Sequence, residues 1–186
     1  MMTKRRLTRY VFWGIISILL LVFGTTWHFL STLETPYLMV GVLNHDNAYR
    51  FPPKPVFWFY LRYVRGPKLD DPKELNLLHF TLNGCHERLP HDKTCVQVID
   101  WLLASGHDIN VRSNDTFGFS PIHGAVLACS KESVKYLIDR GADVNALATG
   151  EKFKGMTPLR LIDEFKSPCG DMNEIAQMLM RRGGHK

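Results

Sequence analysis

The sequence predicts an all-α protein, with one N-terminal transmembrane helix followed by a solenoid of helix-turn-helix units. Three observations lead to this prediction. An apolar run without formal charge covers residues 10–30, three later segments resemble one another, and apolar residues within those segments recur at helical spacing. At 186 residues, the chain has room for one ordinary domain plus such an appendage.

The net charge of +5 is concentrated at the N-terminus. Four basic residues precede the first acidic one, Glu34: Lys4, Arg5, Arg6 and Arg9. Without these four, 19 of the 23 Lys and Arg residues remain against 18 Asp and Glu residues, which leaves a net charge of +1. A nearly neutral domain lacks the basic surface that binds phosphate backbones. We therefore expect no nucleic-acid partner.

Residues 10–30 are long enough to cross a membrane, because a helix of that length rises about 31 Å. A cleaved secretory signal also places a basic stretch before an apolar run, but it ends in small residues. Here the run ends in Trp27, His28 and Phe29, which suit the aromatic belt at a membrane interface. We therefore predict an uncleaved single-pass anchor. The positive-inside rule places residues 1–9 in the cytoplasm and the chain after the span on the other side.

All four cysteines lie in the part of the chain that we expect to be translocated: Cys85, Cys95, Cys129 and Cys169. An even number of cysteines in an oxidising compartment indicates disulfides, and four cysteines allow three pairings. The sequence has no C-x-x-C motif, which argues against a zinc ribbon and against a thioredoxin-type redox site.

Three segments align with one another: residues 76–110, 115–145 and 155–183. Their first helices begin with NLLH, SPIH and TPLR, and their second helices end with WLLASGHDIN, YLIDRGADVN and MLMRRGGHK. This pattern resembles the ankyrin repeat, which starts with G-x-T-P-L-H and ends with G-A-D-x-N. The resemblance covers about residues 75–186. The middle repeat follows the motif most fully, and the repeats at both ends are atypical, as the caps of a solenoid are.

Local residue types support the helix limits that the alignment implies. Pro121 and Pro158 fall at the first helical position, where a missing N–H costs nothing. The residues before the three first helices are N-cap types: Asn76, Ser120 and Thr157. A glycine follows each second helix, where a left-handed residue ends it: Gly106, Gly141 and Gly183.

We divide the chain into four parts: a basic cytoplasmic tail (1–9), a transmembrane helix (10–30), a linker (31–74) and an ankyrin repeat domain (75–186). The linker contains an aromatic segment, residues 55–64, that is too short to span a bilayer. It either caps the apolar face of the first repeat, which we favour, or lies at the membrane surface. In the second case four side chains would lie among the headgroups: Trp58, Tyr60, Arg62 and Tyr63.

The alignment also implies a disulfide pairing. Repeat 1 has an insertion between its helices that Cys85 and Cys95 bracket. Cys129 and Cys169 fall at the matching bends of the next two repeats. We therefore favour the pairs 85–95 and 129–169, each contributing roughly 2–4 kcal/mol to stability.

The sequence gives no support for catalysis. His79 and His123 match the ankyrin histidine that hydrogen-bonds between repeats. The pair His91-Asp92 lies near two cysteines, but its spacing fits no tetrahedral metal site. The chain contains no G-x-S-x-G, P-loop, H-E-x-x-H or dinucleotide-binding motif. We expect no enzyme activity, no cofactor, no metal ion and no small-molecule substrate.

The resemblance implies that a protein partner binds to the concave face and to the finger turns between repeats, residues 111–119 and 146–156. Aromatic and Arg side chains dominate binding energy at interfaces. Phe117 and Phe153 have an alternative, which is to fold back onto their own repeats. The candidate partner-binding residues are Arg112, Asp115, Phe117, Phe119, Glu151, Lys152, Phe153 and Lys154.

Two functions of different classes fit these features. One is an immunity or inhibitor protein, anchored in the bacterial inner membrane, that neutralises a toxin on the periplasmic side. The alternative is an envelope adaptor or scaffold that holds an enzyme or assembly at the membrane. They differ in affinity, since an inhibitor binds one partner tightly and a scaffold binds several weakly. A third interpretation is a eukaryotic type II membrane protein, which a glycan at Asn114 would support.

Overall fold

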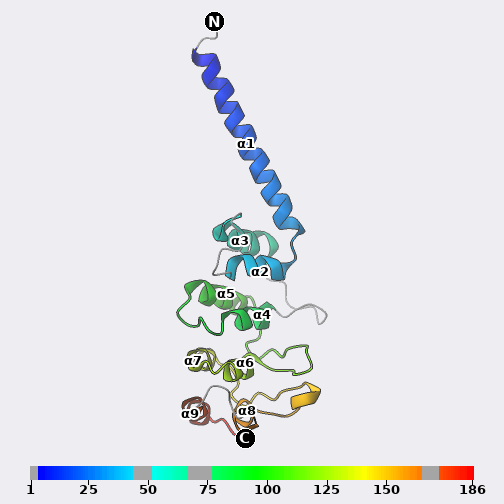
Figure 1. Cartoon of the computed structure of the whole chain (residues 1–186), viewed down its shortest axis with the longest axis vertical. Coiled ribbons are helices and arrows are strands. Elements are labelled where there is room, and N and C mark those ends of the chain that lie inside the picture. Colours follow the sequence, from blue (N-terminus) through cyan, green and yellow to red (C-terminus); the bar gives the residue numbers. More distant parts are fainter. Residues whose placement is uncertain (1–3, 44–51, 67–76, 165–171) are drawn as a thin grey trace. The chain divides into compact units, whose positions relative to one another are not determined.

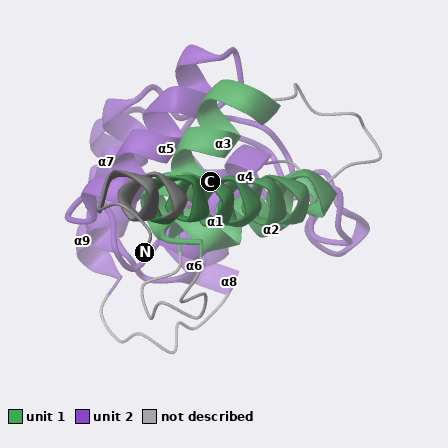
Figure 2. Cartoon of the chain, turned by 90° about the horizontal axis from the view of Figure 1, so that it is seen from above, with its two compact units in different colours: residues 1–66 green, residues 67–186 purple. Residues whose placement is uncertain are grey.

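The computed structural model describes residues 4–43, 52–66, 77–164 and 172–186. All regular elements among these residues are helical, and none is a strand, so the predicted all-α class is confirmed. The chain forms two compact units, Met1–Gly66 and Pro67–Lys186, which are coloured separately in Figure 2.

The longest element of the first unit is α1 (Lys4–Thr32). Its stretch Val11–Thr32 is long and apolar enough to cross a membrane, and none of its most apolar window is buried inside the protein. A secretory signal near an N-terminus can also be this long and this apolar.

Three short helices follow in the same unit and pack on one another: α2 (Thr35–Leu43), α3 (Lys54–Tyr60) and the single π-helical turn η1 (Leu61–Arg65). The aromatic segment of the linker thus forms α3 and most of η1. The Tyr60 ring meets the edge of Trp27 on α1, with the ring centroids 5.2 Å apart. Arg65 donates hydrogen bonds to the carbonyls of Ser31 (3.3 Å) and Leu33 (2.8 Å) at the end of α1.

The second unit contains three helix pairs, which Figure 1 shows as successive layers. They are α4 (Leu77–Cys85) with α5 (Lys93–Ala104), α6 (Pro121–Leu127) with α7 (Lys131–Asp139), and α8 (Pro158–Glu164) with α9 (Asn173–Arg181). The first helices of neighbouring pairs pack on one another, α4 on α6 and α6 on α8. A short 3-10 turn, η2 (Glu151–Phe153), lies in the loop between the last two pairs.

Helix ends follow the residue types at the limits. Ser120 caps α6 in a reciprocal capping box with His123, and Asp92 caps α5 by accepting bonds from the backbone N–H groups of Thr94 and Cys95. The glycines after the second helices take the left-handed conformation that ends a helix, with φ of 95° (Gly106), 88° (Gly141) and 86° (Gly183).

The apolar stripes of the second helices form the core between the layers. On α5, Val98, Ile99 and Leu102 are fully buried, as expected from their spacing, while Leu103 is half-buried. The equivalent positions of the other two repeats are also buried: Val134, Leu137, Ile138, Ile175 and Leu179. One helix pair alone could not bury this stripe on both sides, so the stack depends on its neighbours.

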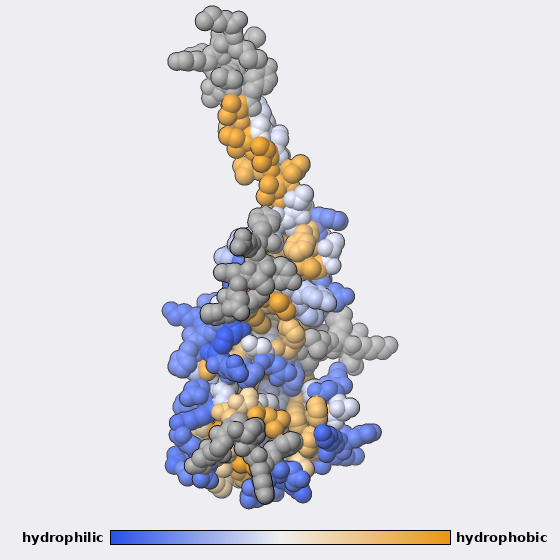
Figure 3. All heavy atoms as spheres, viewed as in Figure 1, coloured by the Kyte–Doolittle hydropathy of each residue, from blue (hydrophilic) through white to orange (hydrophobic). Residues whose placement is uncertain are grey.

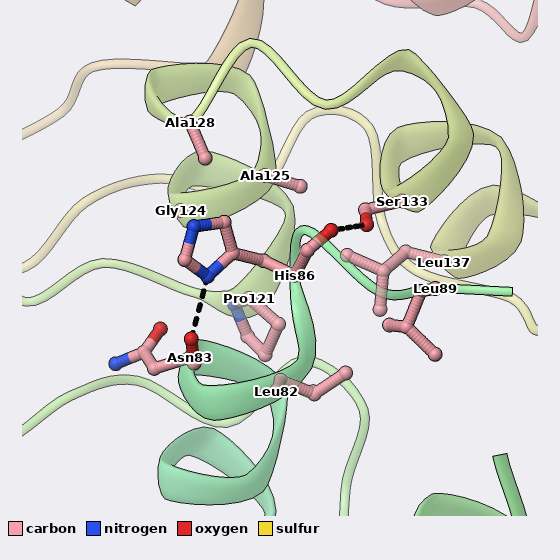
Figure 4. Close-up of a pocket in the computed structure, with 10 residues that line it drawn as sticks. All are labelled: Leu82, Asn83, His86, Leu89, Pro121, Gly124, Ala125, Ala128, Ser133 and Leu137. Carbon is pink, nitrogen blue, oxygen red and sulfur yellow. Dashed lines mark hydrogen bonds between the residues drawn. The ribbon is translucent and has the colours of Figure 1, made fainter. Parts of the chain in front are cut away.

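The insertion of repeat 1 is joined at its base and contacts repeat 2. Cys85 and Cys95 form a disulfide, with their Cα atoms 5.9 Å apart. The carbonyl of His86 accepts a hydrogen bond from Ser130 (3.0 Å), just before α7. It also accepts one from Ser133 on α7, which Figure 4 shows. Beside this contact lies a small cavity of about 110 Å³ between the two repeats.

Cys129, at the bend of repeat 2, is also disulfide-bonded. Its expected partner, Cys169, lies outside the described residues.

Candidate functional site: the paired finger loops

The two finger loops lie side by side and are hydrogen-bonded to each other. The backbone N–H groups of Thr149 and Gly150 donate to the carbonyls of Gly118 (3.1 Å) and Phe117 (3.2 Å). A Cβ atom on Gly118 would lie 2.2 Å from the nitrogen of Gly150, and one on Gly150 would lie 2.2 Å from the carbonyl oxygen of Thr116. Gly118 also has a φ of 58°, which other residues rarely adopt. Two glycines therefore allow the loops to approach this closely.

Three phenylalanines meet where the loops join. The ring centroids of Phe119 and Phe153 are 5.3 Å apart, and the Phe117 ring stacks on Phe119 at 5.6 Å and on Phe153 at 5.7 Å. Phe119 is 9% exposed and Phe153 is 7% exposed, whereas Phe117 is 37% exposed. Phe119 and Phe153 belong to a core cluster with Ala148 and Leu161. Phe117 covers this cluster on the solvent side.

Burial changes what the two inner phenylalanines can do. Both were expected to contact a partner directly, and Phe153 had the alternative of folding back onto its repeat. The structure places both in the core, where they support the loops, and Phe117 is the exposed ring of the three. The reason is physical: the close approach of the loops gives these rings a shared apolar site, and burial removes their large apolar surface from water.

The second finger loop supplies charged residues, one of which lies beside the exposed ring. The Lys152 ammonium lies 5.6 Å from the Phe117 ring centroid and 5.3 Å from that of Phe153, within the range of cation–π attraction. Glu151 and Lys154, close to Lys152 in the chain, are also exposed. The structure thus places the Lys152 ammonium beside the Phe117 ring.

Arg112 and Asp115 hold the first loop in shape. The Arg112 guanidinium donates to the carbonyl of Leu147 in the other loop (2.8 Å) and to that of Asn110. One carboxylate oxygen of Asp115 accepts three hydrogen bonds: from the Ser113 hydroxyl (2.8 Å) and from the backbone N–H groups of Phe117 and Gly118 (2.9 Å each). Partial burial acts to raise the pKa of Asp115, but these bonds outweigh it and lower the pKa.

Sequence reasoning missed one exposed apolar residue of the second loop. Leu147 is 50% exposed, between Ala146 and Ala148, which are both buried. The alternation A-L-A is the signal that could have found it, because neighbouring side chains of an extended segment point to opposite faces. We call the exposed set Phe117, Leu147, Glu151, Lys152 and Lys154 the finger surface.

His123 joins the two repeats behind this surface. Its Nε2–H donates to the carbonyl of Met156 in repeat 3 (3.1 Å), since a carbonyl can only accept. Nδ1 then accepts from the backbone N–H of Ser120 (3.2 Å) and lies 2.7 Å from the Ser120 hydroxyl. The predicted role of this histidine, a hydrogen bond between repeats, is confirmed. Burial lowers the pKa of His123 to about 4, so the ring is neutral near pH 7.

Two further predictions concern His79 and metal binding. Burial lowers the pKa of His79, against the opposing charge of Asp115. Among the described residues, no group of three or more His, Cys, Asp or Glu side chains is placed to hold a metal ion. The finger surface presents apolar and charged side chains to solvent.

Stacked helix pairs with hydrogen-bonded finger loops define a helical repeat solenoid, a class that presents its loops and concave face to other proteins. A family model described as ankyrin repeats, in three copies, matches residues 62–184. The chain belongs to the ankyrin repeat family. It is also 34% identical over 71 residues to an ankyrin repeat protein of Rickettsia bellii (strain RML369-C). That match covers 38% of this chain and 29% of the relative, so the chain spans less than a third of the relative's length.

Proposed function

We propose that this protein is a non-enzymatic, membrane-anchored ankyrin repeat protein that captures a protein partner with its finger surface. The observation that carries the proposal is the pair of exposed apolar side chains, Phe117 and Leu147, on two loops locked together by hydrogen bonds. A loop pair that is already rigid loses little conformational freedom when a partner binds, which favours tight binding.

The anchor is α1, and the repeats lie on the outer side of the inner membrane, in the periplasm. The basic residues before the span and the apolar, unburied surface of Val11–Thr32 support this orientation. Disulfides at Cys85, Cys95 and Cys129 suit an oxidising compartment.

Within this framework the partner is a toxin, and the protein acts as an immunity or inhibitor protein. A small repeat domain with one rigid surface and a membrane tether suits the neutralisation of a single protein at the membrane. The alternative, an envelope adaptor or scaffold, would bind several partners more weakly.

The proposal is tested by affinity capture from native membranes with full-length protein tagged at the C-terminus, followed by mass spectrometry and measurement of Kd for the captured partner. Phe117→Ala combined with Leu147→Ala should weaken binding roughly 30-fold, which corresponds to about 2 kcal/mol for an interface hot spot. Met180→Ala is the matched control, because Met180 is 51% exposed on α9, outside the finger surface. It should leave Kd unchanged.

One stoichiometric toxin-like partner whose binding needs the finger surface would support the inhibitor. Several substoichiometric envelope proteins would support the adaptor instead. A partner whose affinity is the same for the Phe117→Ala, Leu147→Ala variant and for Met180→Ala would show that another surface binds it.

A further inference from the structure

The first unit has an apolar groove of about 860 Å³ between α1 and the start of α3. Its walls are almost entirely hydrocarbon, and on α1 they extend from Ile16 to Thr26, within the stretch long enough to cross a membrane. On the other side, the lining residues come from the segment before and within α3: Pro52, Pro53, Pro55, Val56 and Phe59. Figure 3 shows the hydrophobic surface of the long helix that borders this groove.

The position of α3 along α1 places it at the edge of a bilayer. The stretch Val11–Thr32 has 22 residues and rises about 33 Å, slightly more than a hydrocarbon core of about 30 Å. Trp27 lies about 8 Å before the end of α1, where its aromatic side chain suits the interface belt at the outer limit of that core. Because the Tyr60 ring packs on Trp27, the end of α3 lies at this depth as well.

The exposed face of α3 and η1 has the side chains of a membrane interface. Phe59 is 56% exposed and Tyr63 is 67% exposed, and their ring centroids are 5.2 Å apart. The Arg62 guanidinium lies over the rings of Trp58 (5.7 Å) and Tyr63 (5.5 Å). Tyr and Trp with a neighbouring Arg are the residues that anchor proteins at the headgroup level.

Charge favours anionic lipid. In the described part of this unit from Val11 onward, the acidic side chain is Glu34, and the basic side chains are Lys54, Arg62 and Arg65. Arg65 is bonded to the carbonyls at the end of α1, which leaves Arg62 and Lys54 to meet phosphates.

We propose that α3 and η1 form a lipid-binding wedge at the outer boundary of the bilayer. Acyl chains of the outer leaflet fill the groove beside α1, Phe59 and Tyr63 enter the hydrocarbon edge, and Arg62 contacts lipid phosphates. This inference rests on the proposed membrane anchoring by α1. It assigns the aromatic segment to the membrane, the alternative that the sequence analysis did not favour.

Photo-crosslinking of the full-length protein in native membranes tests the wedge. The photoreactive residue p-benzoylphenylalanine replaces Phe59 in one variant, Leu21 in a second and Phe117 in a third. Leu21 is 68% exposed on α1 and does not line the groove, so it reports the anchor alone. Phe117, on the finger surface, reports background. We expect lipid adducts at position 59 in a yield comparable to that at position 21, and near-background yield at position 117.

The outcomes separate the wedge from the anchor. Lipid adducts at position 21, with position 59 crosslinked only to protein, would overturn the wedge and leave the anchor intact. Absence of lipid adducts at position 21 would overturn the anchor and the wedge together. In proteoliposomes, Arg62→Ala should lower the yield at position 59 when anionic lipid is present and have little effect in neutral lipid. An equal effect of Arg62→Ala in both lipids would overturn the preference of this face for anionic lipid.

Discussion

Acidification should loosen the joint between repeats 2 and 3 through a single buried side chain. His123 is fully buried, donates from Nε2 to Met156 and accepts at Nδ1 from Ser120. A second proton would have to sit on Nδ1, which could then no longer accept from the N–H of Ser120 and would have the Ser120 hydroxyl, 2.7 Å away, as its acceptor. Protonation therefore costs one hydrogen bond and places a charge in the core.

The magnitude follows from the pKa of His123, which is lowered from 6.5 to about 4, first by burial. Because the folded state binds the proton less readily than the unfolded state, the stabilising contribution is present above the unfolded pKa of 6.5. It is lost as the pH falls toward the folded pKa of about 4. Over that window the free energy of unfolding should fall by about 3 kcal/mol on account of this one group.

Urea unfolding of the full-length protein in a non-ionic detergent, followed by far-UV circular dichroism, measures this loss. His123→Gln is the comparison, because Gln can hydrogen-bond but does not titrate. The two proteins are compared by how steeply the free energy of unfolding changes with pH, because the variant also changes that free energy at neutral pH. His79 titrates in both proteins, so its contribution cancels. Parallel slopes for wild type and variant would refute the reasoning.

Two further substitutions test the local geometry. Gly150→Ala places a Cβ 2.2 Å from the carbonyl oxygen of Thr116 and should destabilise the protein by about 1–3 kcal/mol in the same urea measurement. The control is Gly84→Ala on α4, where open space surrounds the added Cβ, and this variant should be neutral or stabilising. Equal effects of both would contradict the close approach of the loops. Asp92→Ala removes the N-cap of α5 and should cost about 1 kcal/mol, while Asp92→Asn keeps the capping oxygen and should cost less; the same loss for both would assign the effect to the ion pair with Arg88.

The helix pairs could be predicted because their signals are local. Ser120 before Pro121 and Gly141 after the apolar end of α7 set helix limits through contacts within a few residues. These limits depend on the chain within one turn of helix, so a single sequence is enough to find them. The hydrogen bond of His123 reaches a residue 33 positions away, and it could be assigned because His123 matches the ankyrin motif.

The finger surface depended on contacts that sequence spacing does not encode. Phe119 and Phe153 are far apart in the chain, and their burial follows from two loops that meet at Gly118 and Gly150. Residue type alone favoured them as exposed anchors. Leu147, in contrast, is exposed. The sequence feature that indicates its exposure is the alternation with Ala146 and Ala148, which is a weak signal in a short loop. The π-helical turn η1 also had no sequence signal.

The glycine contact between the fingers has a consequence for how the solenoid can change in evolution. A Cβ on Gly118 would meet Thr149 and Gly150, and one on Gly150 would meet Thr116 and Phe117, so the loops on the two sides of repeat 2 form a matched pair. A duplicated repeat inserted at this joint would separate them and present each to a loop of different sequence. The new neighbour would need its own glycine at the facing position, or the loop pair would open. Lengthening or exchange of modules is therefore expected at other joints of the stack, with these two loops inherited together.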